Sequence, residues 1–208
     1  MIQWILKKQD EYSKTKPEIK EHSYLPLSTL PYLGRNYTIE LRHLHSYTNY
    51  TDDSNSYSHF SYDYEKVELN NDKLLFYLKY TDYYQNMNDE FIQNKIKQLY
   101  QKWLYEQAPA IFEEKINDFG KLIEVDPPLL QIKILKNRWG SLTKNKKIVL
   151  NINLLKTSEE IIDYIIMHEM IHLKIQGHQH TFWALVHKYI PDYQERINWL
   201  NINGKILL

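Results

Sequence analysis

The residues with the clearest chemical potential form the run His168-Glu169-Met170-Ile171-His172, an H-E-x-x-H motif. Residues four apart lie on one face of an α-helix with Cβ atoms about 5–6 Å apart, so both histidines can reach one metal ion. Glu169 follows the first histidine directly and can act as general base toward a metal-bound water. The motif therefore predicts metal-assisted hydrolysis, with Zn²⁺ as the expected ion.

A third ligand would hold the zinc ion and leave its fourth coordination position open for water. His178 follows Gly177, a residue that can end the helix and turn the chain back toward the metal. His180 and Glu195 remain open as alternative third ligands. The structural alternatives are a helix whose histidines merely occupy polar positions, and a closed zinc site, which would need a fourth ligand and leave Glu169 without a role.

The spacing of the three histidines is that of the metzincins, but the rest of the metzincin pattern is missing. Metzincins carry glycine at the third position after the second histidine, where this chain has Ile175. No methionine follows the motif, so the chain cannot form a Met-turn. The sequence therefore excludes a metzincin.

A capping box indicates where the helix that carries the motif begins, with Thr157 as the expected N-cap and Glu160 three residues later. We expect this helix to run to about Gln176. It should be central, with its histidines in a cleft, because its surface is heavily apolar: Ile161, Ile162, Ile165, Ile166 and Ile171. Further helices are expected at residues 181–189 and around residues 199–200.

Alternating, β-rich segments predict strands at residues 37–44, 73–80, 129–135 and 147–152. We place them in a small, mainly antiparallel sheet packed on the active-site helix, with helices after it, which is an α+β fold. The strand at 147–152 is either an edge that aligns an extended peptide or an ordinary core strand. Between the second and third strands, one helix is expected from Asp89 and another at residues 110–119, ending at Gly120.

The segment Asn137-Arg138-Trp139-Gly140-Ser141 is expected to form a bend between two of these strands. Arg138 could orient a carboxylate or stabilise an oxyanion there. The structural interpretation is a tight turn in which Trp139 packs and Arg138 makes an ion pair. His180, His187 and Tyr193 are further candidates for stabilising the oxyanion.

Composition excludes several other classes of function. The 208 residues suit one domain, or one domain with an appendage. The 26 basic and 26 acidic residues give no net charge to attract nucleic acid or an anionic membrane. Tyrosines in residues 46–64 could stack on bases, but acidic residues lie among them, so we expect no nucleic-acid partner. The absence of cysteine, of a signal-peptide pattern and of a membrane span fits a cytoplasmic protein.

Several segments together resemble the YgjP-like zinc metallopeptidase family, which is related to the SprT-like proteases and has a zincin-like fold. The matching segments run from Leu30-Pro31-Tyr32-Leu33-Gly34-Arg35-Asn36-Tyr37 through Arg138-Trp139-Gly140-Ser141, Asn151, Asp163-Tyr164, the motif with Leu173, His178, Phe182-Trp183, Pro191-Asp192-Tyr193 and Trp199-Leu200. The resemblance implies that His168, His172 and His178 bind zinc and that Glu169 is the catalytic base. One departure is Leu142, which stands where the family has cysteine.

The resemblance also suggests how the chain is organised. Residues 1–33 are expected to form an N-terminal helix around Trp4–Glu11 and a proline-marked loop, as a remnant of a longer family N-terminus. Residues 34–208 are expected to form the YgjP-like metallopeptidase domain. An apparently shortened N-terminus raises the question of whether the chain is active.

Two functional hypotheses follow. The first is a zinc-dependent metallopeptidase that hydrolyses peptide bonds in a peptide or protein substrate by a metal-activated water, with Glu169 as general base. The second is a catalytically degenerate metal-binding module that recognises a protein or a protein–DNA partner. Zinc content and zinc-dependent cleavage of peptides discriminate between them. Neither substrate nor oligomeric state follows from the sequence.

Overall fold

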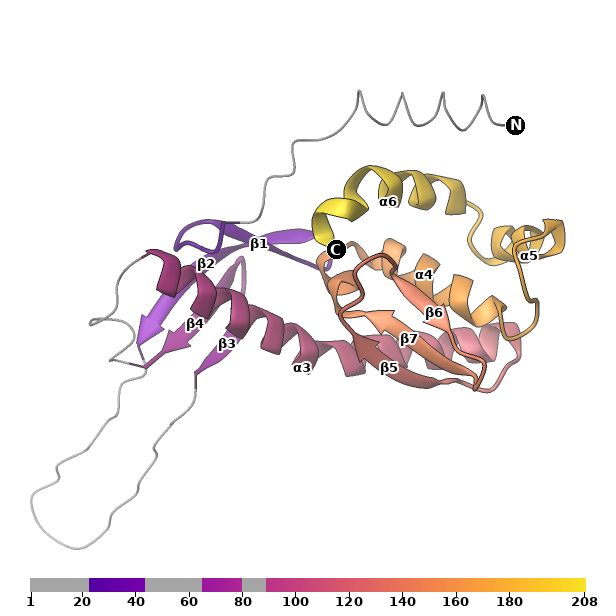
Figure 1. Cartoon of the computed structure of the whole chain (residues 1–208), viewed down its shortest axis with the longest axis horizontal. Helices are drawn as coiled ribbons and strands as arrows, with labels where there is room; N and C mark the ends of the chain where they lie inside the picture. The colour runs from indigo at the N-terminus through magenta and orange to yellow at the C-terminus, as the bar shows by residue number, and fades with distance from the viewer. Residues whose placement is uncertain (1–22, 44–64, 80–88) are drawn as a thin grey trace, which may run out of the picture.

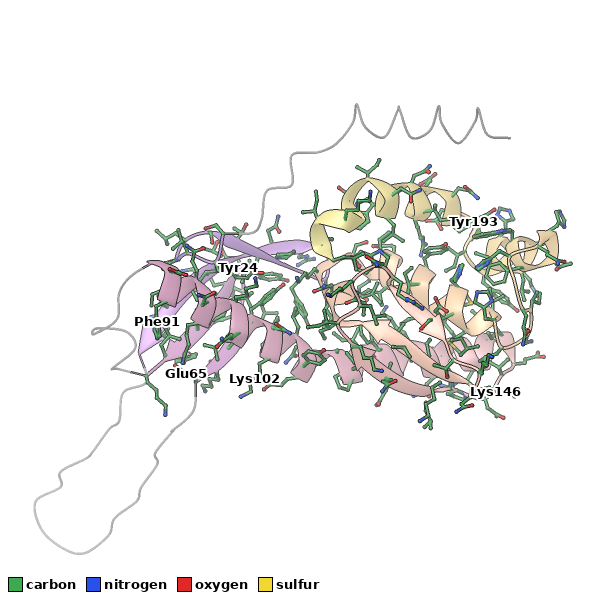
Figure 2. The ribbon with its side chains drawn as sticks, viewed as in Figure 1. Tyr24, Glu65, Phe91, Lys102, Lys146 and Tyr193 are labelled. Carbon is green, nitrogen blue, oxygen red and sulfur yellow. The ribbon has the colours of Figure 1, made fainter. Side chains whose placement is uncertain are left out.

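The computed structural model of the protein describes residues 23–43, 65–79 and 89–208, which form an α+β fold (Figure 1). This confirms the expected fold class, although the described strands form two small sheets instead of one. Buried apolar side chains from both sheets and from the helices form one hydrophobic core (Figure 2). No helix within the described ranges is long and apolar enough to cross a membrane.

The first sheet has the strand order β1-β2-β4-β3. Its strands are β1 (Thr29–Tyr32), β2 (Arg35–His43), β3 (Lys66–Asn70) and β4 (Lys73–Leu78). The pairs β1–β2 and β3–β4 are antiparallel, and β2–β4 is parallel. The sequence predicted β2 and β4. It missed β3, and it placed β1 in a loop.

The hairpin between β1 and β2 connects this sheet to the start of the active-site helix. Leu33 and Gly34 both have positive φ, as a two-residue hairpin turn of type I′ requires. A Cβ at Gly34 would lie 2.9 Å from the Cβ of Ser158, so only glycine permits this approach. The Leu33 N–H also donates to the Leu155 carbonyl at 2.8 Å.

The hairpin spans the expected boundary between residues 33 and 34, and the domain division stays a prediction. The expected helix near the N-terminus lies outside the described residues, as do residues 46–64.

A single helix, α3 (Asp89–Ile123), replaces the two helices expected between residues 89 and 119. Pro109 lies inside it, but the buried face continues on both sides of the proline, through Leu104, Ala108 and Phe112. Gly120 does not end the helix. It allows the chain beyond α3 to pack closely, because a Cβ there would lie 3.0 Å from the Val125 carbonyl oxygen. This long helix packs against β3, β5 and α4 and so joins the two sheets (Figure 1).

The second sheet has the order β5-β7-β6 and lies beside the active-site helix. Its strands are β5 (Leu129–Lys133), β6 (Gly140–Leu142) and β7 (Lys147–Asn151). β7 pairs in parallel with β5 and antiparallel with β6, so of the two alternatives for residues 147–152 the core strand is confirmed and the edge strand is wrong. β7 is a core strand with four consecutive buried residues. The edge strand that packs on the active-site helix is β6.

The active-site helix is α4 (Glu159–Ile171), and it follows the 3₁₀ helix η1 (Ile152–Lys156). Thr157 is not its N-cap: the Thr157 hydroxyl donates to the Leu154 carbonyl at 2.8 Å and closes η1, and Ser158 takes the N-cap position. α4 ends at Ile171, with His172 as C-cap, instead of reaching Gln176. The helices α5 (His180–Tyr189) and α6 (Tyr193–Leu207) follow it.

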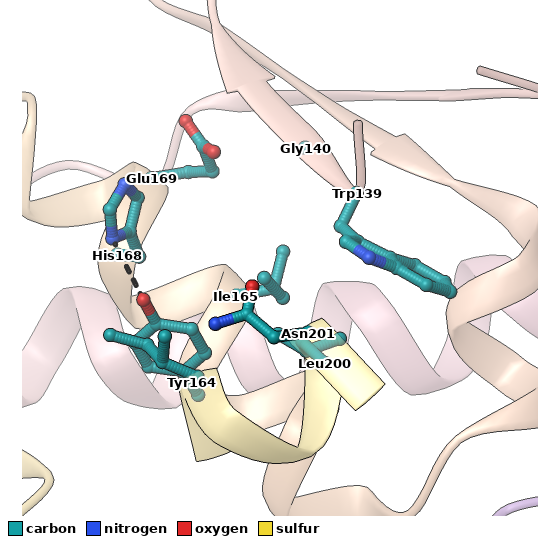
Figure 3. Close-up of a pocket in the computed structure, with 9 residues that line it drawn as sticks. Trp139, Gly140, Tyr164, Ile165, His168, Glu169, Leu200 and Asn201 are labelled. Atoms are coloured by element: carbon teal, nitrogen blue, oxygen red, sulfur yellow. Dashed lines mark hydrogen bonds between the residues drawn. The ribbon is translucent and has the colours of Figure 1, made fainter. Parts of the chain in front are cut away.

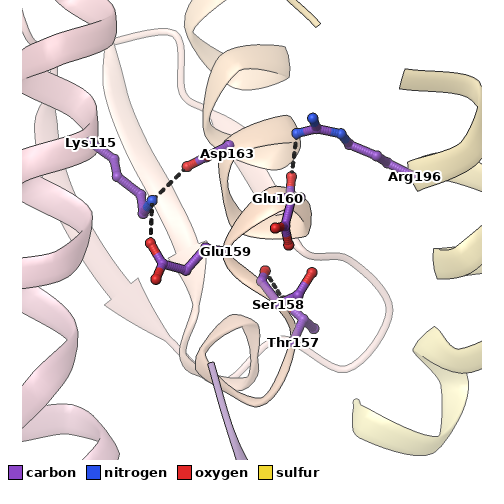
Figure 4. A network of polar contacts seen from close by, with 7 residues as sticks. All are labelled: Lys115, Thr157, Ser158, Glu159, Glu160, Asp163 and Arg196. Carbon is purple, nitrogen blue, oxygen red and sulfur yellow. Dashed lines mark hydrogen bonds and ion pairs between the residues drawn. The ribbon is translucent and has the colours of Figure 1, made fainter. Parts of the chain in front are cut away.

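Ion pairs and one hydrogen bond fix α4 between α3 and α6 (Figure 4). Lys115 of α3 forms ion pairs with Glu159 at 3.1 Å and with Asp163 at 2.7 Å. From the other side, Arg196 of α6 donates to the Glu160 backbone carbonyl at 2.6 Å. α6 is therefore attached to the helix that carries the motif, so residues of α6 are held beside that helix.

Replacing Lys156 by methionine is expected to raise the free energy of unfolding by roughly 1–3 kcal/mol at pH 7. Burial, together with the nearby Lys97, lowers the pKa of the Lys156 ammonium from 10.5 to about 8. The folded state therefore binds this proton less well than the unfolded chain, and the penalty is complete below pH 8. It fades as the pH rises to 10.5, so the wild-type protein should gain stability relative to the variant over that range.

Urea denaturation at pH 7 and at about pH 10.5 measures this difference, with the exposed Lys144→Met as control. An advantage of Lys156→Met that is equal at both pH values would contradict the explanation.

Candidate metal centre

Three histidine side chains converge at the C-terminal end of α4. Each of His168, His172 and His178 offers one ring nitrogen, and these nitrogens all lie within 4.8 Å of one another. The Nε2 atoms of His168 and His178 are 3.0 Å apart. Two nitrogens that bind one tetrahedral zinc ion at about 2.0–2.1 Å would be about 3.3 Å apart, so a small adjustment gives a ligand geometry. This group is able to hold a metal ion.

The end of α4 explains how His178 reaches the other two histidines. The N–H groups of Leu173, Lys174 and Ile175 bond back to the last turn of the helix. Gly177 then adopts a φ of +80°, which reverses the chain. The predicted role of Gly177 as a turn is therefore present, although the helix ends earlier than expected.

Hydrogen bonds orient two of the imidazoles. Nδ1 of His172 lies 3.1 Å from the Ile175 carbonyl oxygen, which can only accept, so this nitrogen carries the proton. The Nε2 lone pair of His172 is therefore available for a metal ion. Nδ1 of His168 lies 3.5 Å from the Tyr164 hydroxyl (Figure 3). This contact is longer than that of His172, but it also involves the Nδ1 atom.

The protein environment keeps the imidazoles of His168 and His172 neutral. Burial lowers the pKa of His168 to about 3, and the neighbouring His172 and His178 contribute to the effect. Burial also lowers the pKa of His172, together with the nearby His178. A neutral imidazole has the free lone pair that a metal ion needs, so His168 and His172 can bind a cation without loss of a proton.

Aromatic side chains of α5 support the three rings. Phe182 is fully buried and stacks on His172 at a centroid distance of 4.6 Å. It also meets the rings of His168 and His178 edge-on, at 4.9 and 4.8 Å. Trp183 lies 5.8 Å from His178 and stacks on Tyr193 at 5.3 Å. The sequence offered no role for Phe182 and Trp183 beyond their match to the family, because the contacts depend on how α5 docks.

Glu169 lies against the start of strand β6 and is 8% exposed. Burial raises the pKa of its carboxyl to about 7, while the Leu142 backbone N–H and the nearby Arg138 oppose this rise. A carboxyl group that titrates near neutral pH is suited to accepting and returning a proton. A Cβ at Gly140 would lie 3.0 Å from Cγ of Glu169 and 3.2 Å from its Oε1, so glycine is needed where the strand crosses this carboxyl.

The other candidate residues lie around this centre in different positions. His180 and Glu195 are exposed, and neither belongs to the group of converging nitrogens among the described residues. His187 is exposed and its ring lies 6.1 Å from that of Tyr193. Arg138 is exposed at the bend before β6, near enough to Glu169 to influence its pKa.

Asn151 holds the bend that carries Arg138 and Trp139. It is fully buried, and its side-chain amide donates to the carbonyl oxygens of Leu135 at 2.7 Å and of Arg138 at 3.0 Å. Its backbone N–H donates to the Trp139 carbonyl at 2.8 Å. A buried amide with these partners fixes the bend relative to β7, and so positions β6 beside Glu169.

Comparison with known proteins gives the family. No similar curated protein was found. Among solved structures, one similar chain is the metallopeptidase zymogen of Pyrococcus abyssi abylysin, which is 26% identical, with a match over 41% of this chain and 90% of that chain and a TM-score of 0.38. The family model of the YgjP-like metallopeptidase domain matches residues 1–203. The chain therefore belongs to the YgjP-like metallopeptidase family, as its motifs predicted.

Proposed function

We propose that this protein is a zinc-dependent metallopeptidase in which His168, His172 and His178 bind the ion and Glu169 is the general base. The observation that carries the proposal is the convergence of three imidazole nitrogens near a buried carboxyl. The donor set fits zinc, which favours imidazole nitrogen and keeps a fourth position open in catalytic sites with three protein ligands.

Bound zinc would polarise the scissile carbonyl and lower the pKa of a water molecule toward about 7. Glu169 accepts a proton from the attacking water and returns it to the leaving amine. Its raised pKa allows both steps near neutral pH, because the group is neither a very weak base nor fully ionised. Phe182 covers one side of the imidazoles and limits access of water there.

Strand β6 is suited to align the substrate. It is an edge strand in the part of the chain that the structure describes, and Gly140 at its start contacts Glu169. An extended peptide that pairs with β6 would run beside the catalytic carboxyl, as peptides do when they add a strand to a sheet edge. The exposed side chain of Arg138 is a candidate for stabilising the oxyanion.

Removal of the metal is expected to abolish peptide hydrolysis, and re-addition of zinc to restore it. The measurement combines the metal content of the purified whole chain, expected as one zinc per chain, with cleavage of a peptide library before and after treatment with a chelator. Cleavage that survives complete removal of the metal would contradict the proposal. Bound zinc without cleavage would favour the metal-binding module, and salt-sensitive DNA binding would then favour its DNA-linked form.

A further inference from the structure

A pocket of about 260 Å³ opens beside the metal centre, between the bend before β6 and helix α6 (Figure 3). This volume is slightly below the range of about 300–1,000 Å³ that accommodates drug-sized ligands, so it suits one amino-acid side chain. His168 and Glu169 of the proposed catalytic machinery form part of its wall, and the rest of its lining has no role in the mechanism proposed above. The residues that matter for its chemistry are Trp139, Ile165, His168, Glu169, Leu200 and Asn201.

The walls of the pocket are fixed by contacts between segments far apart in the sequence. The indole of Trp139 packs directly on Gly204 of α6, where a Cβ would lie 3.3 Å from the ring. Asn151 holds the backbone of the bend on the other side. Arg196 fastens α6 to α4, and Ile165 on α4 is buried. The pocket is therefore a preformed cavity built by three elements.

The position of the pocket relates it to the proposed reaction. His168 and Glu169 belong both to its wall and to the metal centre. Figure 3 shows the Glu169 carboxyl and the His168 ring on one side of the pocket and Trp139 on the other. A side chain inside the pocket must therefore belong to a residue next to the bond that is cleaved.

The lining determines which side chain fits. Apolar surface comes from Trp139, Ile165, Ile197 and Leu200. Besides His168 and Glu169, the polar members of the lining are Tyr164 of α4 and Asn201 of α6. Among the residues that the structure describes, no lysine or arginine lines the pocket, and Glu169 is the only carboxylate in its wall. An acidic side chain would find no positive partner there, and a buried unpaired charge is costly.

We propose that this pocket selects a large apolar residue, such as leucine, methionine or phenylalanine, beside the scissile bond of the substrate. The inference rests on the proposed peptidase function and adds the class of peptide that the site cleaves. A hydrophobic pocket discriminates by about 10–200-fold for each methylene group gained or lost. We therefore expect peptides with a large apolar residue at the selected position to be cleaved at least about tenfold faster than those with glycine.

The test fills the pocket by Leu200→Trp. Cleavage sites in a peptide library are compared by mass spectrometry for wild type, this variant and the control Ile202→Trp. Ile202 is exposed on α6 and lies about 200° around the helix from Leu200, away from the pocket. Leu200→Trp should shift the preference to glycine and alanine, lowering relative cleavage at large apolar residues at least about tenfold. Ile202→Trp should keep the wild-type pattern.

A wild-type preference for acidic or basic residues, or for none, would overturn the proposal while the peptidase function stands. An unchanged preference in folded Leu200→Trp, as judged by circular dichroism, would do the same. If the wild-type protein cleaves nothing, the proposed function fails, and ligand-observed NMR then tests the pocket by itself. N-acetyl-phenylalanine amide should bind wild type and Ile202→Trp but not Leu200→Trp, and N-acetyl-glycine amide should bind none. Absence of binding to wild type would overturn the proposal.

Discussion

Replacing Glu169 by glutamine is expected to abolish peptide hydrolysis and to leave zinc binding intact. Glutamine has nearly the same shape but cannot accept the proton of the attacking water. A positioned acid–base group raises the rate of a reaction about 10²–10⁴-fold. This carboxyl would take part in two proton transfers, from the attacking water and to the leaving amine, so we expect the rate of hydrolysis to fall at least about 10³-fold. The three imidazole nitrogens that could hold the ion are unchanged, because Glu169 does not belong to this group.

The fold should tolerate this change. Burial raises the pKa of Glu169 to about 7, which means that the folded protein disfavours the charged form. A neutral amide therefore removes an unfavourable desolvation, and its oxygen can still accept from the Leu142 N–H. The thermal midpoint of Glu169→Gln should be equal to that of wild type or higher.

The experiment compares zinc content, thermal midpoint and initial rates on a cleaved peptide. The matched control is Glu195→Gln, an exposed position on α6 outside the histidine group, which should keep wild-type rates. Hydrolysis by purified Glu169→Gln at the wild-type rate would disprove the mechanism. Loss of zinc from this variant would instead show that Glu169 helps to hold the ion.

The sequence predicted the parts of the site that depend on local periodicity. His168, Glu169 and His172 lie within five residues of one helix, so their geometry follows from 3.6 residues per turn. The apolar surface of α4 likewise indicated correctly that the helix is central, since Ile161, Ile162 and Ile166 are buried. The same local reasoning gave strands β2, β4, β5 and β7.

The parts that were missed depend on long-range pairing. β6 has three residues and no alternating pattern, and it is a strand only because it pairs with β7. β7 reads as a strand in isolation, but its central place follows from partners on both sides. The pocket depends on Gly204 approaching Trp139, two residues whose relation no local pattern indicates. Pro109 lies between the two helices that the sequence predicted, but the structure has a single helix there. Burial of the flanking residues outweighs the helix-breaking preference of proline.

The choice of third ligand also depended on geometry beyond the sequence pattern. His178 and His180 are two residues apart, and either could reach the metal on spacing alone. The turn at Gly177 brings His178 to 3.0 Å from His168, and His180 begins α5 as an exposed residue.

His178→Ala is expected to weaken zinc binding at least about 100-fold, and His180→Ala to leave it unchanged. Loss of an outer partner of a ligand typically costs about 10–100-fold in metal affinity, and loss of a ligand itself should cost at least the upper value. His178 is exposed, so its removal leaves no buried cavity and should not change the stability of the zinc-free protein.

Competition with a chromophoric zinc chelator measures the affinities, and thermal melts with and without zinc give an independent readout. Zinc at about 100 times its Kd should stabilise wild type and His180→Ala by about 2.7 kcal/mol. For His178→Ala the same zinc concentration should give almost no shift, because it then lies near the weakened Kd. A shift lost in His180→Ala and kept in His178→Ala would assign the third ligand to His180. If both variants keep the zinc-dependent shift, then His168, His172 and a residue other than His178 and His180 hold the ion. The proposed open coordination position would then have to be placed elsewhere.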